Sequence, residues 1–238
     1  MNTKVALVTG AGKRLGRAVA LRLAQDGADV VVHYRSSEAE ARAVVVEIER
    51  LGRRGVALGA DLNRVDEIRG LFAKVKEKLG RLDVLVNSAA NFEHTKFEET
   101  TEQAWDKSLD TNLKAVFFCC QAAAPLLKEA RGAIVNFADI GGILGWPGYI
   151  PHSVSKAGVI MLTRSLAKEL APEVRVNAIA PGTITMAGDP AEWEADFVRL
   201  APLKRSGRPE DVAGAVAYLA GAGFVTGQVL VVDGGRML

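Results

Sequence analysis

Three residues in the second half of the chain have the types and spacing of an acid–base site. His152 and Lys156 are four residues apart, so on a helix they lie one turn apart and can face the same pocket. Asp139 precedes His152 by thirteen residues, after an apolar segment and before a glycine-rich loop. A nearby carboxylate stabilises an imidazolium, so an Asp139–His152 pair can deliver a proton. Tyr149, three residues before His152, is a second candidate donor.

A glycine-rich turn near the start of the chain predicts a phosphate-binding loop. Residues 9–16, TGAGKRLG, lie between an apolar segment and an amphipathic one. Glycines let the backbone approach a pyrophosphate, and the N-terminus of the following helix offers free N–H groups and a positive dipole end. A tight turn without a ligand is the alternative interpretation, which this position between a strand and a helix disfavours.

Strands and helices are expected to alternate along the whole chain. The strand segments are continuous runs of Val, Ile, Leu and Ala, as expected for strands that are covered on both faces. This alternation predicts an α/β fold, one doubly wound parallel sheet of about seven strands with helices on both faces. The predicted strands are 4–9, 29–34, 55–60, 83–87, 132–138, 175–180 and 228–233, and the predicted helices are 15–26, 37–51, 64–79, 102–130, 153–171 and 209–220.

One irregular segment interrupts this alternation late in the chain. Residues 183–208 contain a short helix candidate, DPAEWEADFVRL. In doubly wound sheets ligands bind beyond the carboxyl ends of the strands, where this segment is expected to lie. We therefore expect a single domain, residues 1–238, with a substrate lid at about 183–208.

Composition narrows the possible classes of partner. The 238 residues include 30 basic and 28 acidic side chains, a net charge of +2, so no excess charge indicates binding to nucleic acid or a membrane surface. The chain starts directly with a short strand, and no apolar run approaches the ~20 residues that span a bilayer. Cys119 and Cys120 are adjacent in an apolar helical segment. We expect them to be free buried thiols in a reducing cytoplasm.

Charge at the end of the second strand predicts which nicotinamide cofactor binds. NAD sites place an acid there for the ribose hydroxyl, whereas NADP sites place a cation for the 2′-phosphate. Here the strand ends in His33-Tyr34-Arg35-Ser36, and the next carboxylate is Glu38. Lys13 and Arg14 in the first loop can converge on the same phosphate. The sequence therefore predicts NADPH.

Taken together, these motifs resemble the short-chain dehydrogenase/reductase family over nearly the whole chain. In that family a Ser, or in some branches an Asp, ends the fifth strand, and a Tyr-x-x-x-Lys pair opens the next helix. An alignment without gaps places the tyrosine on His152. The resemblance implies that Lys156 holds the nicotinamide ribose, that Asn112 supports a water relay, and that no metal takes part. It implies the following cofactor-binding set: Gly10, Lys13, Arg14, Leu15, His33, Tyr34, Arg35, Ser36, Asp61, Leu62, Asn87, Ala89, Lys156, Pro181, Gly182 and Ile184.

Several details resemble the pteridine reductase and dihydromonapterin reductase branch of this family. They are KRLG in the first loop, HYRS after the second strand, Asp139 in place of Ser, and the ending FVTGQVLVVDGGRML. In that branch an aromatic residue after the fourth strand helps to hold the pterin, so Phe92 is expected to bind substrate, with Tyr149 near it. Ordinary core packing is the alternative for Phe92. Ala90 and His152 differ from that branch, which uses a hydroxyl residue and a tyrosine at these positions.

Three functions remain open from the sequence. We expect an NADPH-dependent reductase acting on a small molecule, with a pterin-like substrate favoured over other carbonyl compounds. A 3-oxoacyl-thioester reductase is the alternative enzyme, and an NADP-binding protein with little turnover is the alternative outside enzymes. The family usually pairs its long fourth and fifth helices across a twofold axis. The apolar composition of 102–130 and 153–171 thus predicts a symmetric oligomer, a tetramer.

Overall fold

The chain forms one parallel sheet of seven strands with helices on both faces, which confirms the predicted fold. The computed structural model describes residues 3–186, 188–189 and 191–238. The strand order is β3-β2-β1-β4-β5-β6-β7, and every pairing is parallel. The strands are β1 Val5–Val8, β2 Asp29–Tyr34, β3 Gly55–Gly59, β4 Val84–Asn87, β5 Ala133–Phe137, β6 Arg175–Pro181 and β7 Val229–Val232.

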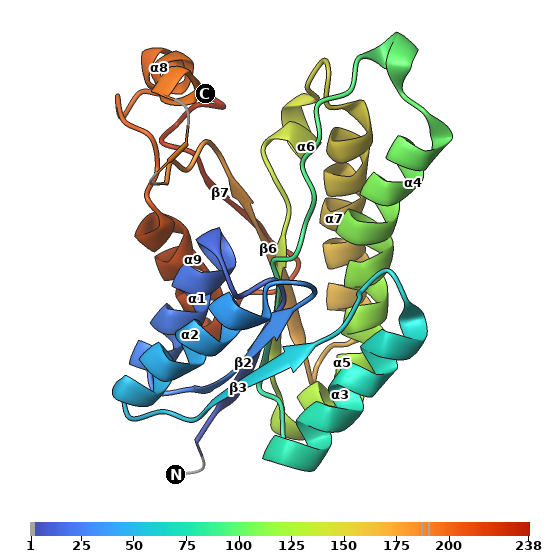
Figure 1. The fold of residues 1–238 in the computed structure, drawn as a ribbon, viewed down its shortest axis with the longest axis vertical. Helices are drawn as coiled ribbons and strands as arrows, with labels where there is room; N and C mark the ends of the chain where they lie inside the picture. The colour runs from blue at the N-terminus through green and yellow to red at the C-terminus, as the bar shows by residue number, and fades with distance from the viewer. Residues whose placement is uncertain (1–2, 187, 190) are drawn as a thin grey trace.

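Two layers of helices cover the sheet, one on each face (Figure 1). The first apolar core lies between the sheet and α3, α5 and α7, and the second lies between the sheet and α1, α2 and α9. The central strands β1, β4 and β5 are buried throughout, because both faces carry helices. The helices of these two layers are α1 Arg14–Gln25, α2 Glu38–Arg50, α3 Val65–Leu79, α5 Ala115–Ala130, α7 Ile150–Glu169 and α9 Pro209–Gly221.

Three glycines lie just past the ends of helices. Gly27, Gly52 and Gly80 follow α1, α2 and α3, with φ of 95°, 75° and 72°. A residue with a Cβ rarely adopts this left-handed conformation, whereas glycine adopts it at little cost.

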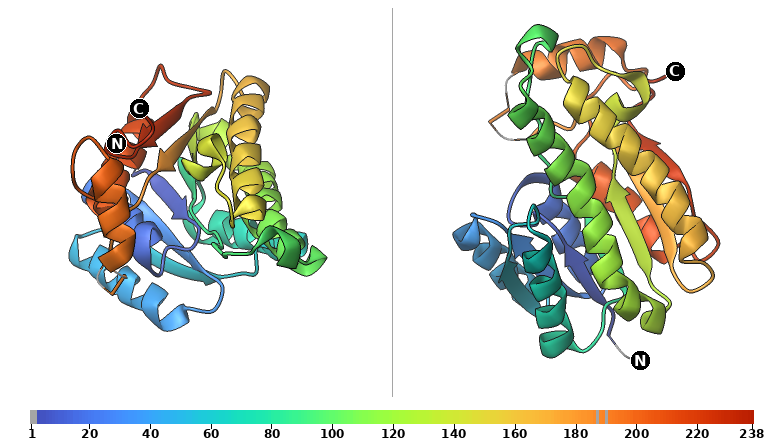
Figure 2. Two further views of the ribbon diagram at one scale, coloured as in Figure 1. Left: turned by 90° about the horizontal axis from the view of Figure 1, so that it is seen from above. Right: turned by 90° about the vertical axis from the view of Figure 1, so that its right-hand side faces the viewer.

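The long predicted helix 102–130 is interrupted in the structure. It divides into α4 (Glu102–Leu109), a π-helical turn (Asp110–Lys114) and α5. Such turns insert a residue into the helical ladder and are common at functional sites. Figure 2 shows α4 and α5 running beside α7 on the outside of the molecule.

Of three further short helices, one is predicted from the sequence and two are not. The lid segment contains α8 (Ala191–Leu200), as predicted, and it lies beyond the end of the sheet near the C-terminus (Figure 1). Neither η1 (Phe97–Glu99) nor α6 (Gly141–Leu144) is predicted from the sequence, because segments of four residues or fewer carry too little periodicity to detect. Among the helices that the structure describes, none is both long enough and apolar enough to cross a membrane.

Candidate active site

A pocket of about 750 Å³ opens at the carboxyl ends of the strands. It extends across the sheet from the loop after β1, past β4 and β5, to the segment after β6. The strand order reverses between β1 and β4, and crevices at such switch points are where doubly wound sheets bind ligands. Asp139, His152, Lys156 and Tyr149 all line this one pocket.

His152 is buried in this pocket with one ring nitrogen left without a partner. Its residue is 4% exposed. Nε2 lies 3.8 Å from Oδ2 of Asp139, and no described residue hydrogen-bonds to it. Asp139 itself is fixed by the backbone N–H of Gly141, which donates to Oδ1 at 2.7 Å. A carboxylate therefore faces Nε2 across a gap too long for a direct hydrogen bond.

Nδ1 of His152 faces polar groups on the opposite side of the ring. The carbonyl oxygen of Asn91 lies 3.3 Å from Nδ1, and Nδ2 of Asn112 lies 3.5 Å from it. Asn112 also binds Asn91 twice: its Oδ1 accepts from the Asn91 N–H at 2.8 Å, and its Nδ2 donates to the Asn91 carbonyl at 3.1 Å. The π-helical turn places Asn112 there, fully buried and outside the pocket lining.

Lys156 lies one turn beyond His152 on α7 and is also buried. Its ammonium donates to the carbonyl oxygen of Phe137 at 2.7 Å. Burial lowers the pKa of Lys156 to about 8, and Asp139 opposes this shift. Pro151 occupies the first turn of α7, where its missing N–H would have no helical partner in any case. The helix therefore begins three residues earlier than predicted and includes His152.

Aromatic side chains form the wall next to His152. Phe92 stacks on Tyr149, with ring centroids 4.5 Å apart and an interplanar angle of 11°. The centroid of the Phe92 ring lies 4.8 Å from that of His152 and 6.3 Å from that of Trp146, and both pairs of rings are close to perpendicular. The N–H of Thr95 donates to the carbonyl of Gly148 at 2.8 Å and joins the two loops that carry these rings. Phe92 is 52% exposed, so core packing alone does not account for its position.

The glycine loop closes the other end of the pocket. A Cβ on Gly16 would overlap the carbonyl oxygen of Gly10, so α1 packs against the loop only with glycine at this position. The side chain of Thr9 accepts from the N–H groups of Ser88 and Ala89, each at 2.9 Å, and ties this loop to the end of β4. The backbone is thus held open for a phosphate at the N-terminus of α1.

His33 supports this loop rather than offering a free side chain. Its ring is 2% exposed. Nδ1 accepts from the N–H of Gly10 at 3.1 Å, and Nε2 lies 3.1 Å from the carbonyl oxygen of Ala60. Both contacts together require the neutral tautomer with the proton on Nε2. Burial lowers the pKa of His33 to about 4.

The three predicted phosphate-binding cations all line the pocket, with different partners. Lys13 pairs with Glu40 on α2 at 2.6 Å. Arg14 pairs with Asp189 in the lid segment at 2.8 Å. Arg35 makes no ion pair with any carboxylate in the described part of the chain. Of the three cations, Lys13 and Arg14 thus have carboxylate partners in this structure, and their convergence with Arg35 on one phosphate stays a prediction.

Two predicted cofactor-binding residues, Tyr34 and Asn87, lie outside the pocket lining. Asn87 is buried, and its Nδ2 donates to Oδ1 of Asn136 at 2.9 Å. The ring of Tyr34 instead lies against Gly59 on the neighbouring strand. The other predicted cofactor residues line the pocket: Gly10, Lys13, Arg14, Leu15, His33, Arg35, Ser36, Asp61, Leu62, Ala89, Lys156, Pro181, Gly182 and Ile184.

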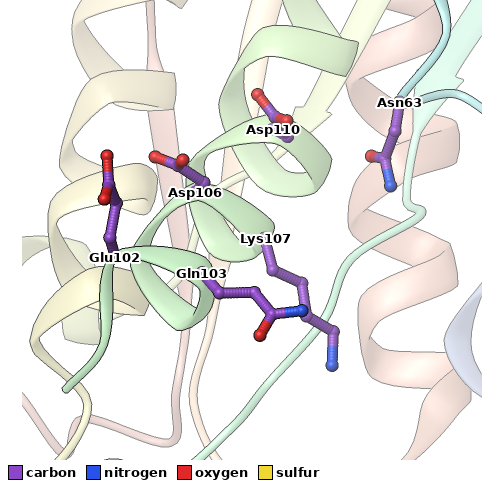
Figure 3. A pocket seen from close by; sticks show the side chains of 6 residues that line it. All are labelled: Asn63, Glu102, Gln103, Asp106, Lys107 and Asp110. Atoms are coloured by element: carbon purple, nitrogen blue, oxygen red, sulfur yellow. The ribbon is translucent and has the colours of Figure 1, made fainter.

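A second, shallower hollow lies over α4 (Figure 3). Its volume is about 470 Å³, and Asn63 faces a row of side chains from α4 and the π-helical turn: Glu102, Gln103, Asp106, Lys107 and Asp110. No nucleophile or aromatic side chain lines it. Within the described residues, no group of three or more His, Cys, Asp or Glu side chains is placed to hold a metal ion.

Comparisons with known proteins agree with this geometry. The model of a family described as enoyl-(acyl carrier protein) reductase matches residues 10–236. The 3-oxoacyl-[acyl-carrier-protein] reductase FabG of Staphylococcus aureus is 42% identical over 243 residues, covering 99% of each chain. The chain belongs to the short-chain dehydrogenase/reductase family of oxidoreductases.

Solved structures of this family share the whole fold. A blue fluorescent protein from a metagenomic library, in complex with NADPH, is 35% identical with a TM-score of 0.94, covering 100% of this chain and 99% of its own. The acetoin dehydrogenase YohF of Salmonella typhimurium is 31% identical with a TM-score of 0.91, covering 99% and 96%. These relatives support the family without singling out the pteridine reductase branch.

Several residues of this short-chain reductase were not identified from the sequence. They are Thr9, Asn91, Trp146 and Asp189, which hold loops or line the pocket. Thr9 and Asn91 each make hydrogen bonds in which one partner is a backbone group, and such contacts have no recognisable pattern in the sequence. Trp146 had a signal, because an aromatic residue in the loop WPGY lies six residues before His152.

Proposed function

We propose that this protein is an NADPH-dependent carbonyl reductase in which His152 replaces the family tyrosine as proton donor. The observation that carries the proposal is the buried imidazole, with acceptors near both ring nitrogens. Asn91 offers a carbonyl to Nδ1 at 3.3 Å, and Asp139 offers a carboxylate to Nε2 at 3.8 Å. Each ring nitrogen therefore has an acceptor on its side toward which an N–H can point.

The proton transfer follows from these contacts. The cofactor supplies hydride to the carbonyl carbon of the substrate. The alkoxide oxygen that develops takes the proton from Nε2 of His152, whose ring becomes neutral. Nδ1–H continues to donate to Asn91, which Asn112 holds in place on two sides. The Asp139 carboxylate lies 3.8 Å from Nε2 and accepts no proton in this step.

Charge and shape support NADPH as the cofactor. Arg35 and Ser36 stand at the end of β2 in the pocket lining, and a solved relative binds NADPH. Lys156, which is buried and donates to the Phe137 carbonyl, would hold the nicotinamide ribose, as the family resemblance implies. The loop opened by Gly10 leaves backbone N–H groups for the pyrophosphate.

The relatives favour a 3-oxoacyl thioester as substrate, because the FabG protein is named for that activity. A pterin-like ring is a second candidate, and the stacked pair Phe92 and Tyr149 favours it. Flat heterocycles gain from offset stacking on an aromatic face, and Phe92 is half exposed beside His152.

A direct test compares NADPH oxidation with acetoacetyl thioesters and with dihydropterins. The thioester is expected to be reduced, and His152→Ala should lower turnover by about 10²-fold or more while NADPH still binds. Tyr149→Phe is the matched control, since it retains the stacked ring and removes only a hydroxyl. His152→Tyr should retain or raise activity on a carbonyl substrate.

Other outcomes assign the site differently. Loss of turnover in Tyr149→Phe with a near-neutral His152→Ala identifies Tyr149 as the donor. Oxidation with dihydropterins alone favours the pterin-like ring. Tight NADPH binding with no oxidation by either class favours a binding protein with little turnover. The cytoplasm as compartment, the lid at 183–208 and a symmetric oligomer stay predictions.

A further inference from the structure

An ion pair joins the cofactor loop to the lid segment 183–208. The guanidinium of Arg14 donates to both carboxylate oxygens of Asp189, Nη1 to Oδ1 at 2.8 Å and Nη2 to Oδ2 at 3.1 Å. The two residues are 175 positions apart in sequence. Paired bonds of this kind fix orientation as well as charge. This contact therefore links the two segments in a defined orientation.

Arg14 adopts a backbone conformation that is unfavourable for an arginine. Its φ is 49°, in the left-handed region that residues with a Cβ rarely adopt. It is also the first residue of α1, at the positive end of the helix dipole. Such strain is concentrated at functional sites. The cofactor loop thus bears a cation, at a cost in backbone energy, where an anion is expected to bind.

The anion that holds Arg14 in this structure comes from the lid. Asp189 also accepts the N–H of Met186 at 3.0 Å, so this carboxylate binds a second group within the lid segment. Its side chain is only 11% exposed, and Arg14 lowers the pKa of the Asp189 carboxyl. Both residues line the pocket together with Gly10 and Ile184.

We propose that Asp189 competes with the cofactor for Arg14. The inference rests on the proposed NADPH binding. A guanidinium that faces a carboxylate with both Nη groups cannot present the same pair to a phosphate. Phosphate therefore replaces Asp189 when the cofactor binds, and the lid loses its bond to the loop. Asp189 lowers cofactor affinity and couples the lid to cofactor occupancy, since linkage between two such equilibria is reciprocal.

Lys13 offers a matched control for charge alone. It pairs with Glu40, at 2.6 Å, on the other side of the same loop. Glu40 lies on α2 and contacts no lid residue through this pair. Removal of the Glu40 charge therefore also takes a carboxylate partner from a cation of this loop, but it breaks no bond to the lid through this pair.

The test measures binding and lid exchange rather than turnover. We compare wild type, Asp189→Asn and Glu40→Gln by NADPH titration and by amide hydrogen exchange in residues 183–208, with and without NADPH. Asp189→Asn should bind NADPH about fivefold more tightly, near the upper range for a partly exposed pair. Its lid should exchange faster without cofactor, as the wild-type lid does with NADPH. Glu40→Gln should leave lid exchange unchanged.

Several results would overturn the proposal. Weaker NADPH binding by Asp189→Asn means that Asp189 supports the cofactor site instead of competing for it. Unchanged lid exchange in Asp189→Asn, measured without cofactor, removes the link between lid and loop. The absence of NADPH binding in all three proteins refutes the proposed function as well. NADPH binding that leaves amide exchange in the lid unchanged refutes only this inference.

Discussion

Acidification is expected to destabilise this protein through His33. The folded protein holds this ring neutral, since Nδ1 accepts from Gly10 and Nε2–H donates to Ala60. A proton on Nδ1 would remove the acceptor for the Gly10 N–H at a ring that is only 2% exposed. The unfolded chain takes up that proton at an ordinary pKa. Stability is therefore present above pH 6.5 and is lost as the pH falls toward 4.

The size of the effect follows from the two pKa values of His33. Burial lowers the pKa from 6.5 to about 4 in the folded protein, and each unit corresponds to about 1.36 kcal/mol. Linkage then predicts a loss of roughly 2 kcal/mol at pH 5 and roughly 3 kcal/mol at pH 4. This is a large part of the 5–15 kcal/mol that typically stabilises a domain.

Urea unfolding at pH 7 and pH 5 measures this term when wild type is compared with His33→Asn. Asparagine retains an oxygen for the Gly10 N–H and does not titrate. Between pH 7 and pH 5 the free energy of unfolding of His33→Asn should therefore fall by about 2 kcal/mol less than that of wild type. Exposed His94 gives the matched control, and His94→Asn should follow wild type. An equal loss in wild type and His33→Asn would refute the assignment, because carboxyl groups alone would then account for the acid sensitivity.

Three further predictions concern the cofactor, the buried lysine and the assembly. Arg35→Asp should weaken NADPH more than NADH in titrations, since charge-assisted phosphate contacts are worth about 1.5–3 kcal/mol; equal binding of both cofactors by wild type contradicts this. Burial lowers the pKa of Lys156 to about 8, so kcat/KM should fall as the ammonium is lost above pH 8, and Lys156→Arg should remove that decline. Light scattering should give a mass well above the 25.3 kDa monomer, and Met161→Asp, on the exposed apolar face of α7, should lower it.

The sequence alone determined the sheet, its helical layers and one edge of the site. Continuous Val, Ile and Leu runs that alternate with helical segments are typical of a parallel sheet, because its strands are joined by helical crossovers that cover both faces. Parallel strands end at one edge. Three features are therefore expected to lie together there: the glycine loop after β1, Asp139 after β5, and the helix with His152 and Lys156. Spacing within one helix placed the last two residues in one pocket.

Tertiary structure decided which atoms face the reacting group. The Asn91 carbonyl beside His152 depends on a loop path and on a π-helical turn, neither of which has a residue signature. His33 looked like a cofactor ligand in sequence, yet both ring nitrogens bind backbone. Asp189 meets Arg14 across 175 residues. Contacts of this kind depend on how loops from separate crossovers pack, and local pattern carries no information about that packing.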